Sequence, residues 1–236
     1  FIAAHLYQAE GAYIVSLDVI DKNGTVGSTK TVTINVTDEE RVFGGTNTYC
    51  FSNDLDFIVC PHDTNNDGVC DVHSGNCIGN INSFSAAISY IGQNRRLLFK
   101  KDDEFFIPTS GTEINGIGPM MLGSFGTGAR RPHLRFQDQV GTWADAIKIS
   151  ASDVRVMNFE MTSENYDMDN SAHIVTNGQN NLIYGMKFNP GIRFNVVLLH
   201  KGFVIDSEMT PAWYDIVGQA SESAMMGSSW EHSRHG

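Results

Sequence analysis

The chain has 236 residues, of which 41% are hydrophobic and 18% charged, a composition typical of one large or two small globular domains. Its formal net charge of −11 argues against nucleic acid and anionic membrane surfaces as partners, because both attract clustered Lys and Arg. No run of about 18 apolar residues is present, so no membrane span is expected. The 23 glycines and many asparagines favour short strands and tight turns, which predicts an all-β fold.

Residues 1–38 have the pattern of two strands joined by a turn. Apolar side chains occupy alternate positions of 13–20, as expected for a strand with one buried face. Residues 21–24 contain Asn-Gly, which suits the positive φ of a hairpin turn. Alternation resumes over 29–36, so the sequence predicts an antiparallel hairpin here.

The amino-acid sequence of this hairpin resembles the second half of a PKD domain, an immunoglobulin-like β-sandwich. The likeness covers 4–36 and consists of a His-x-Tyr at 5–7 and a Gly-x-Tyr-x-Val-x-Leu-x-Val-x-Asp strand at 11–21. The early half of the family pattern, with its Trp-Asp-Phe-Gly-Asp-Gly segment, is missing. A piece this short buries too little surface to be stable alone. We therefore expect neighbouring domains or chains to complete the half-domain at 1–38. The polar, glycine-containing residues 39–47 are expected to form a linker.

The segment 48–80 holds all four cysteines of the chain, Cys50, Cys60, Cys70 and Cys77. An even count in one loop-rich segment predicts two disulfides and a secreted, extracellular protein. Four cysteines allow three pairings, and we favour Cys50–Cys60 with Cys70–Cys77 because both close short loops. A zinc site is the alternative, but the gaps of nine, nine and six residues lack the close pairs typical of zinc ligands.

Within this segment, 63–71 reads Asp-Thr-Asn-Asn-Asp-Gly-Val-Cys-Asp, which matches the first nine places of an EF-hand-type loop. We expect one bound Ca²⁺, held by Asp63, Asn65, Asp67, the Val69 carbonyl and Asp71. Position 12 is Ser74 instead of the bidentate Glu of an EF-hand. His62, Asp56 or a carbonyl from 72–77 would therefore complete the shell. The loop resembles thrombospondin type 3 and dockerin repeats, and a solvated Asn/Asp turn is the alternative.

A short helix is predicted over 82–92. Apolar residues recur there at i, i+3, i+4 and i+7 from Phe84, and Ser83 suits the N-cap. From Arg95 onward the pattern changes to short strands separated by tight turns.

The stretch 95–136 resembles the opening coils of a right-handed parallel β-helix. The likeness rests on a buried strand at 97–100, an acidic turn with Phe at 102–105, and a glycine-rich turn before proline at 123–132. It implies that 81–236 forms a right-handed parallel β-helix, incomplete at its C-terminal end, whose open first coil is capped by the short helix.

An internal repeat supports a solenoid independently. The segments 156–161, 183–188 and 204–209 align at offsets of 27 and 21 residues, the length of one coil. Stacking in this register predicts three columns: Val156, Ile183 and Val204; Met161, Phe188 and Met209; and Asn158, Gly185 and Asp206. The first two columns are apolar. The third contains only residues that tolerate the left-handed conformation, as a sharp bend between strands requires.

A fourth column, two positions after the bend, is charged: Glu160, Lys187 and Glu208. It predicts either a face that binds an acidic sugar or an alternating-charge ladder between strands, and the ladder is favoured. In polysaccharide lyases a basic residue abstracts the proton for β-elimination. The resemblance thus makes four basic residues catalytic candidates: Lys187, Arg193, His200 and Lys201.

The pairing of a PKD-like module with a parallel β-helix is similar to secreted bacterial or archaeal polysaccharide-degrading enzymes. The sequence therefore suggests a secreted, Ca²⁺-dependent protein that acts on extracellular polysaccharide, as a polysaccharide lyase or glycoside hydrolase. A non-catalytic carbohydrate-binding, adhesion or structural protein is the alternative.

Overall fold

The computed structural model describes eight stretches of the chain: residue 7, 9–54, 76–137, 144–164, 172–190, 193–210, 214–218 and 223–230. Two units are distinguished, Phe1–Val42 and Phe43–Gly236, and their boundary falls within the predicted linker. Strands dominate and the helices are short, in agreement with the predicted all-β class. None of the helices in the described stretches is long and apolar enough to cross a membrane.

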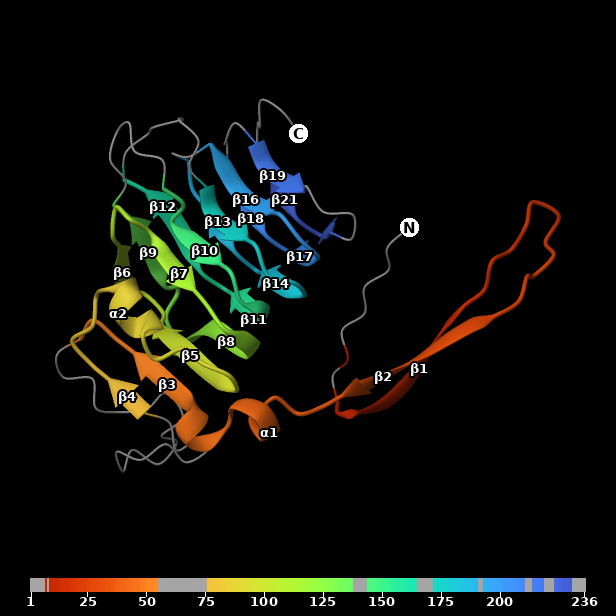
Figure 1. The fold of residues 1–236 in the computed structure, drawn as a ribbon, viewed down its shortest axis with the longest axis horizontal. Helices are drawn as coiled ribbons and strands as arrows, with labels where there is room; N and C mark the ends of the chain where they lie inside the picture. Colours follow the sequence, from red (N-terminus) through yellow and green to blue (C-terminus); the bar gives the residue numbers. More distant parts are fainter. Residues whose placement is uncertain are drawn as a thin grey trace. The chain divides into compact units, whose positions relative to one another are not determined.

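The first unit contains the predicted antiparallel hairpin, formed by β1 (Gly11–Leu17) and β2 (Lys30–Val36) (Figure 1). The carboxylate of Asp21 accepts a hydrogen bond from the backbone N–H of Asn23 at 2.8 Å. Gly24 adopts a φ of 83°, which glycine tolerates without strain. The Asn-Gly turn predicted from the sequence is therefore confirmed.

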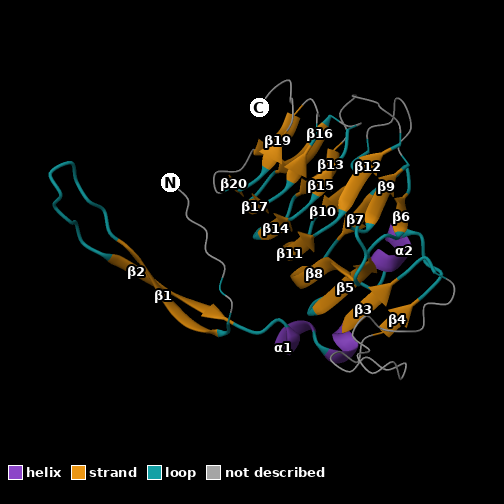
Figure 2. Ribbon diagram, turned by 180° about the vertical axis from the view of Figure 1, so that it is seen from behind, coloured by secondary structure: helices purple, strands orange, loops and turns teal. Residues whose placement is uncertain are grey.

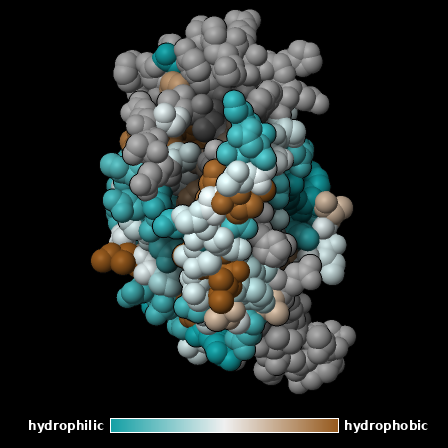
Figure 3. Space-filling view, turned by 90° about the vertical axis from the view of Figure 1, so that its right-hand side faces the viewer, coloured by the Kyte–Doolittle hydropathy of each residue, from teal (hydrophilic) through white to brown (hydrophobic). Residues whose placement is uncertain are grey.

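Large apolar side chains of this hairpin are exposed to solvent. Ile14 is 75% exposed, Leu17 56% and Val32 57%. Exposed hydrophobic residues appear as separate brown areas in the space-filling view (Figure 3).

The second unit is built from three parallel sheets (Figures 1 and 2). The five-stranded sheet contains β7 (Thr112–Ile114), β10 (Ile147–Ile149), β13 (Ala172–Thr176), β16 (Phe194–Leu198) and β19 (Tyr214–Gly218). The eight-stranded sheet contains β4 (Asn76–Ile78), β3 (Thr48–Phe51), β5 (Arg95–Lys100), β8 (Ile117–Phe125), β11 (Ser152–Met157), β14 (Asn181–Tyr184), β17 (Gly202–Ile205) and β20 (Ala224–Met226). The six-stranded sheet contains β6 (Glu104–Ile107), β9 (His133–Phe136), β12 (Glu160–Ser163), β15 (Lys187–Phe188), β18 (Glu208–Met209) and β21 (Ser229–Trp230).

The chain visits the three sheets in a repeating order. The passage from β10 through β11 to β12 adds one strand to each sheet, and β13, β14 and β15 then add the next strands beside them. Every strand pair among the described residues of this unit is parallel, so each passage of the chain stacks on the one before it.

All three columns predicted from the internal repeat are confirmed. Val156 pairs with Ile183 and Ile183 with Val204, and all three side chains are fully buried. The second apolar column is likewise in register and buried. The bend column, Asn158, Gly185 and Asp206, has φ angles of 62°, 59° and 47°. The repeat in the sequence thus corresponds to successive passages through the same three sheets.

The predicted helix is confirmed over a shorter range, as α2 (Phe84–Ile88). The Ser83 hydroxyl accepts a hydrogen bond from the backbone N–H of Ala86 at 3.2 Å, so it is the predicted N-cap. Phe84 is fully buried, and its ring centroid lies 5.4 Å from that of Phe99. Two further short helices, α1 (Glu40–Phe43) and η1 (Gly45–Asn47), precede β3.

Both ends of the cysteine segment belong to the eight-stranded sheet, where β3 pairs with β4 and β5. Cys50 on β3 has a free thiol, 2% exposed, in contact with Leu98 and Phe125. Burial raises the pKa of this thiol to about 12. The predicted Cys50–Cys60 disulfide is therefore wrong. Cys77 is disulfide-bonded, and its partner lies outside the described residues.

Candidate functional site

A row of polar side chains crosses one face of the six-stranded sheet. The first residues of five neighbouring strands are in register: Glu104, His133, Glu160, Lys187 and Glu208. The residue after each of them is buried in the core, so by strand alternation the row itself points away from the core. We call these five residues the polar row.

A loop beside the polar row is longer than the equivalent connections in later passages. The chain passes from β11 to β12 through two residues, 158 and 159, but from β8 to β9 through 126–132. The carboxylate of Asp102 holds this loop by accepting hydrogen bonds from the backbone N–H groups of Ala129 at 3.2 Å and Arg130 at 2.8 Å. The side-chain Nε of Arg130 also lies 3.9 Å from this carboxylate.

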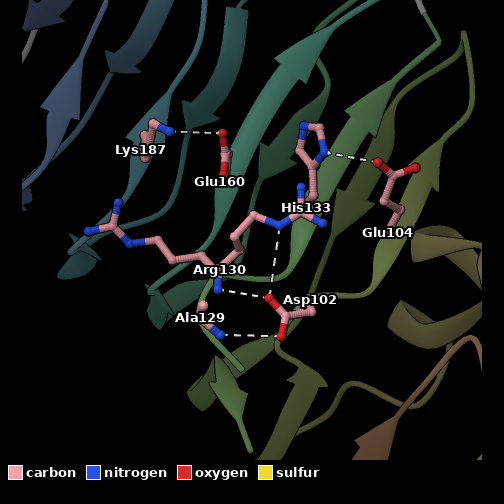
Figure 4. A pocket seen from close by; sticks show the side chains of 8 residues that line it. Asp102, Glu104, Ala129, Arg130, His133, Glu160 and Lys187 are labelled. Atoms are coloured by element: carbon pink, nitrogen blue, oxygen red, sulfur yellow. Dashed lines mark hydrogen bonds and ion pairs between the residues drawn. The ribbon is translucent and has the colours of Figure 1, made fainter. Parts of the chain in front are cut away.

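The loop and the polar row enclose a cleft of about 520 Å³ (Figure 4). Glu104, His133, Glu160 and Lys187 of the polar row line it together with Asp102, Ala129, Arg130 and Arg131. In Figure 4 the Glu160–Lys187 and Glu104–His133 contacts lie above Ala129 and Arg130 of the loop 126–132. The side chains come from four neighbouring strands and two turns. The cleft therefore combines three cations, three carboxylates and an imidazole.

The Glu160 carboxylate contacts two neighbouring polar side chains. The Lys187 ammonium lies 3.1 Å from its Oε1, and the Asn189 amide donates to the same oxygen at 2.6 Å. Burial favours the neutral carboxyl, but the hydrogen bonds from Asn189 and Lys187 outweigh it, so the pKa of Glu160 is lowered. The predicted charge ladder is thus confirmed between Glu160 and Lys187. Glu208, in turn, pairs with Arg131 at 2.8 Å.

His133 lies between a carboxylate and a hydroxyl. Its Nδ1 is 3.4 Å from Oε1 of Glu104, and its Nε2 is 2.8 Å from Oγ1 of Thr162. A carboxylate only accepts hydrogen bonds, so Nδ1 carries the hydrogen of the neutral ring. The Thr162 hydroxyl accepts from the Asn189 amide at 3.0 Å and has its own hydrogen to donate to Nε2. Nε2 is therefore the ring nitrogen whose lone pair can accept a proton.

The second carboxylate beside His133 is also held ionised. Arg135 lies 3.3 Å from Oε2 of Glu104. Burial raises the pKa of Glu104, but the contacts with Arg135 and His133 outweigh burial and lower it overall. Neither Glu104 nor Glu160 is therefore a carboxyl group kept protonated by its surroundings.

Of the four basic candidates predicted for catalysis, only Lys187 lines the cleft. Arg193 precedes β16, and its guanidinium lies 5.1 Å above the ring of Phe194. His200 and Lys201 are exposed in the turn between β16 and β17. Among the predicted substrate-binding residues, Glu160 and Lys187 lie in the cleft, whereas Glu208 contacts it through Arg131.

The predicted Ca²⁺ loop at 63–71 lies outside the described residues, so calcium binding stays a prediction. Within the part of the chain that is described, no group of three or more His, Cys, Asp or Glu side chains is arranged to hold a metal ion.

His133, Glu104 and Arg130 line the cleft but were not predicted from the sequence as site residues. His133 lies 27 positions before Glu160, the same offset that separates Glu160 from Lys187. Extending the repeat one passage toward the N-terminus would have placed His133 in the charged column. The 27-residue offset was thus a sequence signal for His133. Arg130 lies in the loop 126–132, which has no equivalent in the repeat, so the repeat could not have indicated it.

In comparisons with known proteins, no family model, curated protein or solved structure matches this chain. The functional assignment therefore rests on the cleft and on the chemistry of its residues.

Proposed function

We propose that this protein is secreted and acts on extracellular polysaccharide, which binds in the cleft beside the polar row. The observation that carries this proposal is the in-register row of polar groups facing an open cleft with three cations. Parallel strands repeat at about 4.8 Å, so the row presents evenly spaced donors and acceptors to a polymer with repeating hydroxyls. The cations Arg130, Arg131 and Lys187 suit a polymer that also carries carboxylates.

The proposal includes the architecture that the sequence suggested. We assign the three-sheet unit to the right-handed parallel β-helices, and its support is the repeated visit to three parallel sheets with a left-handed residue at one bend. We assign the hairpin of β1 and β2 to a PKD-like half-domain. The exposed Ile14, Leu17 and Val32 support a neighbouring domain or chain that covers them.

Elimination fits the cleft better than hydrolysis. Glycoside hydrolysis needs one carboxyl group that stays protonated and acts as general acid. The pKa values of Glu104 and Glu160 are both lowered, which is the wrong direction for that role. Elimination from a uronate needs instead cations that bind the sugar carboxylate and a base that removes the adjacent proton, and the cleft holds both.

We assign Nε2 of His133 as this base. With a uronate carboxylate held by Arg130, Arg131 or Lys187, the C5–H bond breaks and its proton passes to Nε2. The electron pair forms the C4=C5 double bond, the C4–O bond breaks, and water protonates the leaving oxygen. Glu104 on Nδ1 would stabilise the imidazolium that forms. The substrate must displace Thr162 from Nε2 for this step.

Non-catalytic carbohydrate binding is the second candidate. It is favoured by the pairing of the cleft groups with one another, since Lys187 is held by Glu160 and Nε2 of His133 by Thr162. Such a face would bind hydroxyls and carboxylates without a free base.

The experiment is a screen of the full chain against pectate, alginate and chondroitin, read as absorbance of the unsaturated uronate product. We expect product from at least one substrate, and its loss in His133→Ala. The matched control is His200→Ala, an exposed histidine outside the cleft, which should keep the wild-type rate. Binding without product would select the non-catalytic candidate. Neither binding nor product with any acidic polysaccharide would contradict the proposal.

A further inference from the structure

A second cleft, of about 550 Å³, adjoins the first on the same side of the six-stranded sheet. Asp102, Glu104 and Arg130 line both clefts, so the two are continuous. The remaining lining residues of the second cleft are Asn53, Asn80, Asn82 and Phe106. Apart from the three shared charged residues, the lining of the second cleft is uncharged, whereas the first cleft adds Arg131, Lys187 and Glu160.

Two separate segments bring the three asparagines together. Asn53 follows β3, and Asn80 and Asn82 lie between β4 and α2. The backbone carbonyl of Asn82 accepts a hydrogen bond from the N–H of Phe106 at 2.6 Å, which fixes this segment against β6. Asn80 adopts a φ of 55°, a conformation that asparagine tolerates. The asparagine side chains therefore stand on backbone that is held in place.

The amide groups of these asparagines are available to a ligand. All three residues are exposed, and within the described residues none of their side chains makes a hydrogen bond. Each amide offers both donors and an acceptor, which is the combination that sugar hydroxyl and acetamido groups use. The partly buried ring of Phe106, which has the Arg135 guanidinium 5.5 Å from its centroid, adds apolar surface to the lining of this cleft.

The combined groove is long enough for several linked sugar rings. From Lys187 through Glu160, His133 and Glu104 to the edge beside Asn82 it crosses four strand spacings, or about 19 Å. The groups that differ between the two clefts change along this length, from the charged side chains of Lys187 and Glu160 at one end to asparagine amides at the other.

We propose that the asparagine cleft is a binding subsite for a neutral sugar of the same polysaccharide whose uronate occupies the first cleft, beside Arg131 and Lys187. The ligand is then a polysaccharide in which acidic and neutral sugars are joined, rather than a homopolymer of uronates. This inference rests on the proposed function, because it takes the first cleft as the uronate site.

The test compares the affinities of two oligosaccharides by calorimetry on the full chain. One is unsulfated chondroitin oligosaccharide, which alternates glucuronate with N-acetylgalactosamine, and the other is oligogalacturonate of equal length. The variant is Asn80→Gly with Asn82→Ala, where glycine preserves the positive φ. The matched control is Asn94→Gly, an exposed asparagine with a φ of 61° outside both clefts. Asn53→Ala serves as an independent second variant, and thermal midpoints confirm folding.

We expect the wild type to bind the alternating oligosaccharide more tightly. The double variant should lose roughly tenfold in affinity for it, since each lost hydrogen bond costs a few-fold. Its affinity for oligogalacturonate should change less than twofold, and Asn94→Gly should change neither. Equal affinities of wild type and variants for the alternating ligand, with binding retained, would overturn this inference and leave the proposed function standing. Failure of the wild type to bind either oligosaccharide would overturn both.

Discussion

Replacing Gly185 by valine tests the bend column of the three-sheet unit. Gly185 has a φ of 59°, a conformation that costs a β-branched residue about 1–3 kcal/mol. A Cβ atom at this position would also overlap Oδ1 of Asn158 in the neighbouring bend. We therefore expect the free energy of unfolding to fall by ~1–3 kcal/mol. At about 2–4 °C per kcal/mol for a unit of this size, the melting temperature should fall by roughly 2–12 °C.

Gly185→Asn is the matched comparison, because asparagine tolerates positive φ and already occupies the bend before it at Asn158. Its Cβ meets the same Oδ1 atom, which lies at the end of a rotatable side chain and can move. We expect this variant to lose less than about 1 kcal/mol.

Both substitutions are repeated in an Asn158→Gly background, where the overlapping oxygen is absent. Thermal and urea unfolding, followed by circular dichroism, measure the four differences as a double-mutant cycle. If backbone strain is the cause, the gap between the valine and asparagine variants persists in this background. Equal melting temperatures of the two variants would refute the reasoning. A gap that disappears with Asn158 would assign the effect to the overlap instead of to φ.

Three further results are expected. Thiol titration in denaturant without reductant should find at least one free sulfhydryl, Cys50, which reacts slowly in the native protein because it is buried and its pKa is about 12. Calorimetry should detect one Ca²⁺ bound per chain, and Asp67→Ala should weaken this binding. A titration of the wild type with Ca²⁺ that shows no heat of binding would contradict the predicted calcium site. Burial lowers the pKa of His173 from 6.5 to about 4. The folded state thus binds this proton less readily than the unfolded state, so the stability His173 contributes is present above pH 6.5 and lost as the pH falls toward 4. His173→Gln should flatten the melting temperature over that range, and a control His200→Gln should not.

The repeated strands could be predicted from the sequence because their pattern is local. Val156, Ile183 and Val204 occupy equivalent places in segments that alternate in the same way, and a bend that needs positive φ accepts few residue types. The same regularity placed Glu160 and Lys187 side by side on the sheet.

The cleft itself could not be predicted in this way. It exists because the loop 126–132 interrupts the repeat, and the contacts of Asp102 with Ala129 and Arg130 join residues far apart in the sequence. Spacing likewise says nothing about the surroundings of Cys50. The even number of cysteines suggested that all were oxidised, but the burial of this one depends on how β3 packs against Phe125.

Chemical-shift mapping of the labelled full chain with an acidic oligosaccharide tests the central claim most directly, because it locates the bound ligand without requiring turnover. We expect shifts of the backbone signals of His133, Glu160 and the loop 126–132, with no change at Lys148 and Val175 of the five-stranded sheet. Shifts confined to the five-stranded sheet, or no shifts at saturating ligand, would contradict the claim that polysaccharide binds beside the polar row.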